Sequence, residues 1–402
     1  MTETQSIIEA YRRAKTKNVR AALATVVRVN GSAYRRPGAR MLLTEDGRTT
    51  GVVSGGCLDG DVRERAARVM RTGRPTVVRY DTTTDEDVVW GLGLGCNGVV
   101  DVLIEPANES ADHLMRFLEK CSHAQHRAAF ATVIRSETNA RLPVGSRVFL
   151  CPDGGFTTDG NPEVLPSTRI LSDLQVAVHS GLSFVAQYEA NGTLDVFIEA
   201  VAAPLRLVIF GAGADASPLV EMAQRLGWLA TVVDTHARAR SLERFAEADA
   251  VVLCRPEDLA VRVPLVGSTA AVVMTHNYVH DLEVLNVLLS KPLRYVGCLG
   301  PRHRTDRLLS QLRDAPGTVQ TSWHGPLHAP VGLDVGAETP SEIALSIVAE
   351  ILAVTRGRTG GPLQVRTGAI HGDAPAPAND DALRVAEVTR PTSVACQAAR
   401  AN

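Results

Sequence analysis

The sequence lacks several features that would each place it in a special class of protein. It has no excess of one charge, because 42 Lys and Arg residues stand against 44 Asp and Glu residues, a formal net charge of −2. Such a chain has no global basic field, so we expect neither nucleic acid nor an anionic membrane surface as a partner. Its seven cysteines include no CxxC pair, which fits neither a secreted disulfide framework nor a structural zinc site.

Long apolar runs are missing as well. The segment 343–354 is among the most apolar, yet it is short and contains Glu350. The N-terminus is polar and helix-like, so we expect neither a signal peptide nor a membrane span. Together with the cysteine pattern, this predicts a cytoplasmic protein in a reducing compartment. The sequence also shows no evident internal repeat.

The composition that is present is that of a folded globular protein. Of the 402 residues, 45% are apolar and 21% charged, and this length favours two domains. Residues 21–106 are rich in strand-forming runs separated by glycine clusters, with one amphipathic helix that ends near Gly73. More strands and a second helix follow to about residue 200. We therefore predict a mixed α+β N-terminal domain over 1–200.

A different texture begins after residue 200. Residues 205–234 predict a βαβ unit: an apolar strand, a glycine turn, a helix closed by Gly227 and another strand. Further short strands alternate with helices, and a final helix opens on a capping box formed by Thr339 and Glu342. The fold class is therefore α/β, with a C-terminal Rossmann-like, doubly wound parallel sheet over 201–360. Residues 361–402 are rich in Gly, Ala and Pro and predict a loose tail.

The glycine turn of the second domain is a candidate nucleotide site. Gly211 and Gly213 lie between a strand and a helix, and Asp234 closes the next strand. Backbone N–H groups at such a turn bind phosphate, and the acid can accept a hydrogen bond from a ribose hydroxyl. The alternative is a Rossmann-shaped domain that uses no dinucleotide.

Two further strand ends carry polar groups. His276 is a candidate ligand contact or acid/base group, because ligands gather beyond the carboxyl ends of the strands in open α/β sheets. Gly300 and Arg302 follow a neighbouring strand, where the arginine either faces a phosphate or is simply exposed. His276 and His280 could suggest a metal, but no third ligand is visible.

The first domain offers a second glycine turn, which presents a thiol. Gly55, Gly56 and Cys57 lie between a strand and the predicted helix, and a thiol at a helix N-terminus favours its thiolate, a nucleophile and soft-metal ligand. The alternative is a small buried cysteine. A glycine-rich loop presents Cys96, so the two thiols could flank one sulfur- or metal-bearing ligand.

Three arginines surround a Gly/Pro loop in the same domain. Arg35, Arg36 and Arg40 suit a phosphate or a carboxylate, since a guanidinium donates in a planar fork. Taken alone, such a loop is more often a solvated surface loop.

These segments together resemble the XdhC/CoxI family of xanthine dehydrogenase accessory proteins. The resemblance covers roughly residues 5–355 through GSAYRRPGARMLL, GVVSGGCLDGDV, GLGLGCNG, MTHNYVHDLEVL and RYVGCLGPRHR, in that order. It implies an N-terminal accessory domain and a Rossmann-like domain that bind molybdenum cofactor (molybdopterin). It further implies support for the sulfuration of that cofactor and for its insertion into xanthine dehydrogenase-type or carbon monoxide dehydrogenase-type enzymes.

The resemblance also assigns residues and partners. Cys57 occupies the family's SGGC position and is the expected cofactor thiol and metal ligand, and Cys96 matches the second cysteine loop. The implied partners are a molybdoenzyme client and a cysteine desulfurase-like sulfur donor, while homodimerisation is left open. The implied role is that of a cofactor-binding maturation factor rather than a stand-alone enzyme, because the chain lacks iron–sulfur cysteine spacings and is too short for flavin and molybdenum modules.

Two other functions remain as alternatives. An NAD(P)-dependent oxidoreductase would rely on Gly211, Gly213, Asp234 and His276. A redox or sulfur-transfer protein would use Cys57 and Cys96 as a pair that forms and breaks a disulfide.

Overall fold

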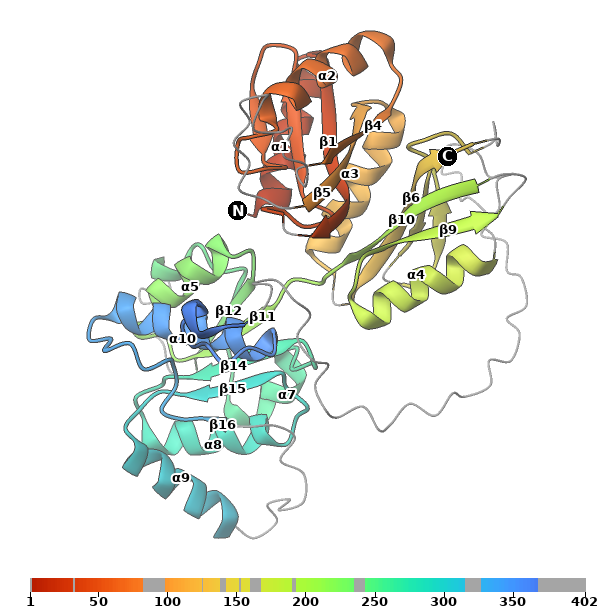
Figure 1. Ribbon diagram of the computed structural model, residues 1–402. Coiled ribbons are helices and arrows are strands. Elements are labelled where there is room, and N and C mark those ends of the chain that lie inside the picture. The colour runs from red at the N-terminus through yellow and green to blue at the C-terminus, as the bar shows by residue number, and fades with distance from the viewer. Residues whose placement is uncertain are drawn as a thin grey trace, which may run out of the picture.

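Three β-sheets organise the chain in the computed structural model (Figure 1). The structure describes residues 2–31, 33–81, 98–124, 126–137, 142–151, 153–159, 168–189, 193–234, 243–314 and 327–367. Two sheets are antiparallel and lie before residue 202, and the third is parallel and begins at Arg206. The predicted fold class, a C-terminal Rossmann-like sheet with an N-terminal mixed α+β part, is confirmed.

The first sheet has the strand order β3-β2-β1-β5-β4 and is accompanied by two helices. The element bounds are α1 Glu3–Thr16, β1 Ala21–Gly31, β2 Arg40–Thr44, β3 Thr49–Gly51, α2 Asp59–Thr72, β4 Thr76–Asp81 and β5 Gly98–Pro106. Alternate residues of β1 point to opposite faces, so Ala22 and Ala24 pack under α2 while Leu23 packs against α1.

The second sheet has the equivalent order β8-β7-β6-β10-β9. Its element bounds are α3 Glu109–Ser122, β6 Ala128–Ser136, β7 Arg147–Leu150, β8 Phe156–Thr158, α4 Thr168–Ser180, β9 Phe184–Glu189 and β10 Thr193–Val201. Helices and strands therefore follow one another in the same sequence as in the first sheet. We call residues 3–106 the first repeat and residues 109–201 the second repeat.

This duplication corrects the expectation that the chain has no internal repeat. The sequence ALATVVR at 22–28 returns as AFATVIR at 129–135, and DVLIE at 101–105 returns as DVFIE at 195–199. The strand register agrees, because Arg40 pairs with Thr25 in the first repeat and Arg147 pairs with Thr132 in the second. The likeness is confined to short strand segments, so it does not stand out as a periodicity of the whole sequence.

The two repeats share a core and exchange ion pairs. One cluster combines Leu23 and Leu42 of the first sheet with Phe130 and Phe149 of the second. Ion pairs also cross between the sheets: Arg40 contacts Glu199 at 2.6 Å, and the corresponding Arg147 contacts Glu105. All four side chains are at least nine-tenths buried, so these pairs hold the repeats together from inside the protein.

The third sheet is parallel throughout, with the order β13-β12-β11-β14-β15-β16. Its strands are β11 Arg206–Phe210, β12 Leu229–Asp234, β13 Ala250–Leu253, β14 Thr269–Val273, β15 Tyr295–Cys298 and β16 Leu327–His328. Its helices are α5 Ala216–Arg225, α7 Leu259–Arg262, α8 Tyr278–Leu289, α9 Arg302–Asp314 and α10 Pro340–Thr355, with short 3-10 turns at Glu243–Phe245, Pro256–Asp258 and Leu363–Val365.

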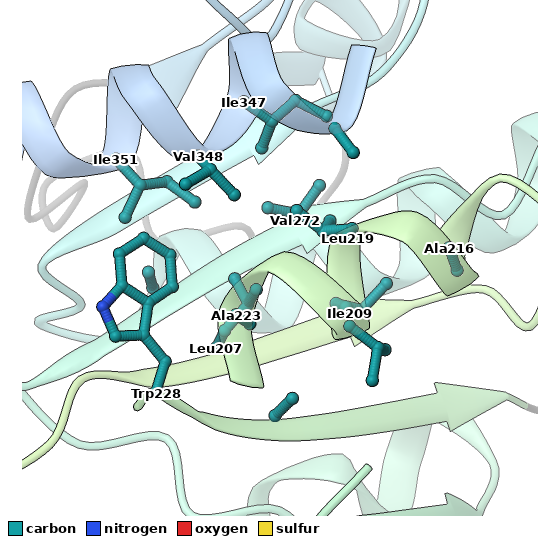
Figure 2. Packing of buried hydrophobic residues seen from close by; sticks show 14 of the residues in the cluster. Leu207, Ile209, Ala216, Leu219, Ala223, Trp228, Val272, Ile347, Val348 and Ile351 are labelled. Atoms are coloured by element: carbon teal, nitrogen blue, oxygen red, sulfur yellow. The ribbon is translucent and has the colours of Figure 1, made fainter. Parts of the chain in front are cut away.

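Helices cover both faces of this sheet, as a doubly wound fold requires. Figure 2 shows Ile347, Val348 and Ile351 of α10 facing α5 and the sheet. The predicted capping box at the start of α10 is present, since Thr339 Oγ1 accepts a hydrogen bond from the Glu342 N–H and the Glu342 carboxylate accepts one from the Thr339 N–H. Among the described helices, none combines the length and apolarity that crossing a membrane would need.

Candidate functional site

The Cys57 loop, residues 52–58, connects β3 to α2. Ser54 Oγ accepts hydrogen bonds from the N–H groups of Gly56 at 3.0 Å and Leu58 at 3.2 Å, and it donates to Asp59 Oδ1 at 2.7 Å. Ser54 therefore satisfies two backbone donors of the loop, one of them at Leu58, the N-cap of α2. Gly56 has a φ of +108°, a conformation that favours glycine. The loop thus holds Cys57 just ahead of the first turn of α2.

Cys57 is the described thiol best placed for chemistry. Burial raises the pKa of the Cys121 and Cys298 thiols to about 12, and it also raises the pKa of Cys151 and Cys254. Raised values keep these thiols protonated and unreactive. Cys57 is partly exposed and lies on a loop at the edge of the core.

The three predicted arginines have different environments. Arg40 is buried, donates to the Gly38 carbonyl oxygen at 2.8 Å and pairs with Glu199, so its guanidinium is committed inside the protein. Arg35 pairs with Glu3 of α1, while its buried Nε has no hydrogen-bond partner among the described residues. Arg36 is exposed and makes no ion pair with a described residue. Arg35 and Arg36 are therefore the two that remain accessible to a ligand.

A cavity of about 380 Å³ lies between this arginine loop and the start of α1. It is lined by Glu3, Thr4, Ile7 and residues 34–40. The Tyr34 ring lies against Gly55. A Cβ atom added at Gly55 would be 3.6 Å from the nearest ring carbons. Cys57 packs on the same core cluster as Ala33 and Ala39 at the two ends of the arginine loop. The structure therefore brings the predicted Arg35, Arg36, Gly55, Gly56 and Cys57 into one region.

Cys96 lies outside the described residues, so its proximity to Cys57 stays a prediction. The nearest described residue is Gly98, which begins β5 and pairs with Gly31 at the end of β1. Gly98, which follows the segment that carries Cys96, and Gly31, which precedes the arginine loop, therefore lie at the same end of the sheet.

The glycine turn of the third sheet is sterically demanding. Gly211 has a φ of +122°, and a Cβ there would overlap the backbone of Met274 at the end of β14. Gly213 is also tightly enclosed, since a Cβ there would overlap the Asp215 carboxylate. Gly211 thus serves the close approach of the chain beyond β14, whereas a side chain at Gly213 would meet the Asp215 side chain of the same turn.

Carboxylates occupy this turn from two sides. Asp234 Oδ2 accepts a hydrogen bond from the Ala212 N–H at 2.8 Å, and Asp215 Oδ2 contacts His276 Nε2 at 2.7 Å. His276 has a φ of +57°, an uncommon conformation for a residue with a side chain. Asp215 precedes the first turn of α5, so its negative charge lies where a dinucleotide phosphate would bind and disfavours it there.

A buried network joins the neighbouring strand ends and is not predicted by the sequence patterns. Asp281 is fully buried, accepts from Thr275 Oγ1 at 2.5 Å and pairs with Arg304 at 2.7 Å. This network links β14 to α8 and α9, whereas Arg302 is exposed at the start of α9 and Gly300 has a φ of +141°. Asp281 and Arg304 lie in motifs that the sequence singled out, but only the fold shows that they meet. No group of three or more His, Cys, Asp or Glu side chains within the described ranges could hold a metal ion.

The glycine turn gives a direct test of this packing. Replacing Gly211 with alanine is expected to lower the free energy of unfolding by about 2 kcal/mol or more, because the new Cβ meets backbone and the φ is positive. Gly60 on α2 is the matched control, because a Cβ there meets no atom within 4 Å and should stabilise the helix by up to about 1 kcal/mol. Urea unfolding of both variants is the measurement, and equal stability of Gly211→Ala and wild type would contradict this packing.

Two sequence models of known families match this chain. The model of the XdhC and CoxI family matches residues 14–81, and the model of the XdhC Rossmann domain matches residues 207–351. A protein of Bacillus subtilis (strain 168), whose name describes a probable xanthine dehydrogenase subunit, is 36% identical over 334 residues, which are 83% of this chain and 92% of that protein. The chain belongs to the XdhC and CoxI family. The resemblance drawn from the motifs is thereby confirmed.

Other proteins extend this relationship over most of the chain. The "Molybdenum cofactor insertion chaperone PaoD" of Escherichia coli (strain K12) is 25% identical over 336 residues, 83% of each protein. A crystal structure described as a xanthine dehydrogenase from Bacillus halodurans aligns with a TM-score of 0.66 and 29% identity, covering 90% of this chain and 99% of that one. This structural alignment spans most of the chain and thus both the repeats and the parallel sheet.

Proposed function

We propose that this protein is a maturation factor that binds molybdenum cofactor and delivers it to a molybdoenzyme of the xanthine dehydrogenase or carbon monoxide dehydrogenase type. The observation that carries the proposal is a partly exposed thiol, Cys57, on a loop whose Gly55 lies against Tyr34, a residue that lines the arginine cavity. The names of the relatives from B. subtilis and E. coli support the same role. Among the described residues, no group of catalytic side chains accompanies the Cys57 thiol. The relative named as an insertion chaperone is therefore a better guide to this site than an enzyme would be.

The residues of the site fit the chemistry of this cofactor. The molybdenum of this cofactor is already bound by the sulfur atoms of a dithiolene, so a thiolate suits it as a further ligand, and the pterin carries a phosphate that suits arginine donors. Cys57 would supply the sulfur ligand. Arg36 would donate hydrogen bonds to the phosphate, and so would the Arg35 Nε, which has no partner among the described residues. When bound, the cofactor supplies the metal–sulfur chemistry that the client enzyme later uses.

The chain's own contribution is binding, orientation and release. The positive φ of Gly56 and the hydrogen bonds of Ser54 fix the direction of the Cys57 side chain, and the arginine loop neutralises the phosphate. Cys57 would either contact molybdenum or receive the sulfur atom that a cysteine desulfurase-like donor provides during sulfuration. Cys96 would act as a second thiol on the neighbouring loop.

Retention of the cofactor tests this function. The full-length protein is mixed under anaerobic conditions with molybdenum cofactor released from a molybdoenzyme, unbound material is removed, and retained molybdenum and pterin are quantified. We expect about one equivalent in wild type and about tenfold weaker retention in Arg36→Ala, because a charge-assisted hydrogen bond to phosphate is lost. Arg68→Ala removes an exposed arginine of α2 that makes no ion pair with a described residue, so this control should retain the cofactor normally.

A parallel titration with NADH and NADPH examines the alternative oxidoreductase. The Asp215 carboxylate at the N-terminus of α5 predicts no saturable binding, because it repels the phosphates of a dinucleotide. Saturable nucleotide binding without molybdenum retention would overturn the proposed function.

A further inference from the structure

The first turn of α1 places a carboxylate in the arginine-lined cavity. Glu3 Oε1 accepts a hydrogen bond from the Val52 N–H at 3.2 Å, and Glu3 Oε2 pairs with Arg35. Val52 is the first residue of the Cys57 loop. One carboxylate therefore holds both a cationic donor of the cavity and the backbone at the entrance to the thiol loop.

The second repeat contains an equivalent contact between its first helix and the residue that follows its third strand. Buried positions Ile7 and Tyr11 of α1 correspond to Leu114 and Leu118 of α3, which aligns Glu3 with Ser110. Likewise Val52 directly follows β3, as Asp159 directly follows β8. Ser110 donates to the Asp159 carboxylate, so the helix-to-loop contact occurs in both repeats, with the carboxylate on opposite partners.

The two contacts differ in how easily they can be broken. The Asp159 side chain is 6% exposed, and its carboxylate also accepts from the Arg147 N–H at 2.5 Å. The Glu3 side chain is 39% exposed and stands at the wall of a cavity of about 380 Å³. The carboxylate of the second repeat is therefore fixed, while that of the first repeat is accessible to a competing anion.

We propose that the Glu3 carboxylate occupies the position on Arg35 that the phosphate group of the ligand takes. When a phosphate monoester enters the cavity, it displaces Glu3 and pairs with Arg35. A phosphate monoester carries about −1.5 to −2 charges and three acceptor oxygens, against one charge on the carboxylate. It can also engage the Arg35 Nε, a buried donor that has no hydrogen-bond partner within the described ranges. The inference rests on the proposed function, because it names the cofactor group that the arginine loop receives.

Displacement has a consequence for the Cys57 loop. Once Glu3 leaves, the Val52 N–H loses its acceptor, and the start of the Cys57 loop loses this hydrogen bond to α1. Entry of the phosphate thus acts on Val52 at the start of the Cys57 loop, while the hydrogen bonds of Ser54 still hold the part of the loop next to Cys57.

The test uses inorganic phosphate as the probe and the full chain as the protein. The thermal unfolding midpoint is followed as phosphate is added to wild type, Glu3→Gln, Arg35→Met and Glu64→Gln, each relative to its own phosphate-free midpoint. Chloride at matched ionic strength corrects for general salt effects. Glu64 is an exposed acid of α2 and serves as the matched control.

We expect Glu3→Gln to reach half-saturation at a phosphate concentration about fivefold lower than wild type, since an exposed ion pair no longer competes. Glu64→Gln should match wild type, and Arg35→Met should lose the response. An unchanged or weaker phosphate response in Glu3→Gln, or a full response in Arg35→Met, overturns the proposal.

A second arm separates this inference from the proposed function. Phosphate is added during the retention of molybdenum cofactor by wild type, and it should displace the cofactor where chloride at matched ionic strength does not. If no variant retains molybdenum while Glu3→Gln still shows the tighter phosphate response, the anion site stands and its ligand is a different phosphate compound. If molybdenum is retained but Glu3→Gln responds to phosphate as wild type does, the carrier function stands and the role of Glu3 is refuted.

Discussion

Replacing Cys57 with alanine is expected to abolish the retention of molybdenum without unfolding the protein. The side chain is partly exposed on a loop, so its removal leaves no large cavity in the core. No other described thiol can take its place, because burial raises the pKa of the Cys121, Cys151, Cys254 and Cys298 thiols. Metal analysis and pterin fluorescence after gel filtration are the measurements.

Two variants control this experiment. Cys151→Ala removes another partly exposed cysteine, in the second repeat, and should retain the cofactor as wild type does. Cys57→Ser keeps the size of the side chain but replaces the soft sulfur with a hard oxygen, so it should behave as Cys57→Ala. Unchanged molybdenum in Cys57→Ala would rule out a role for this thiol in binding.

Replacing Glu105 with alanine is expected to lower the free energy of unfolding by about 3–5 kcal/mol, because it leaves the buried Arg147 guanidinium without its partner. Asp159 lies 3.9 Å from that guanidinium, but burial raises the pKa of its carboxyl group, which makes it a poor replacement. Urea unfolding with a two-state fit measures the loss. The free energy refers to the unit that contains both repeats, since the pair joins them.

A double-mutant cycle shows whether the pair itself is responsible. Arg147→Met combined with Glu105→Leu replaces both charges by apolar groups and should recover most of the loss. The exposed pair of Asp61 and Arg65 on α2 provides a contrast, since Asp61→Asn should cost less than about 1 kcal/mol. A loss for Glu105→Ala as small as that for Asp61→Asn would show that the buried pair contributes little to stability.

Local sequence signals predict much of the parallel sheet. The alternation of apolar strand, glycine turn and amphipathic helix is encoded within about 30 residues, so β11, α5 and β12 can be identified from their own sequence. The start of α10 is equally local, because the Thr339 hydroxyl and the Glu342 carboxylate serve donors in the same turn. The Cys57 loop can likewise be predicted from its own glycines and from the helix that comes after it.

Contacts between distant segments cannot be predicted in this way. Within its loop Arg40 has the pattern of a ligand contact, yet Glu199 of the second repeat, far along the chain, holds it inside the core. The repeat is hard to detect in the sequence because its two copies agree mainly along the strands. Glu3 belongs to no motif, and its role near Val52 emerges only when α1 packs beside β3.

The sequence by itself determined the fold class, the family and the two loops that carry the thiol and the arginines, because each depends on residues that are neighbours in the chain. The tertiary structure decided which of those groups are free for a ligand. It withdrew Arg40 into a buried ion pair, set carboxylates beside the glycine turn of the parallel sheet and placed Glu3 against Arg35. The charge of a side chain is neutralised by the groups that the fold places within a few ångströms of it, and the local sequence does not specify which groups those are.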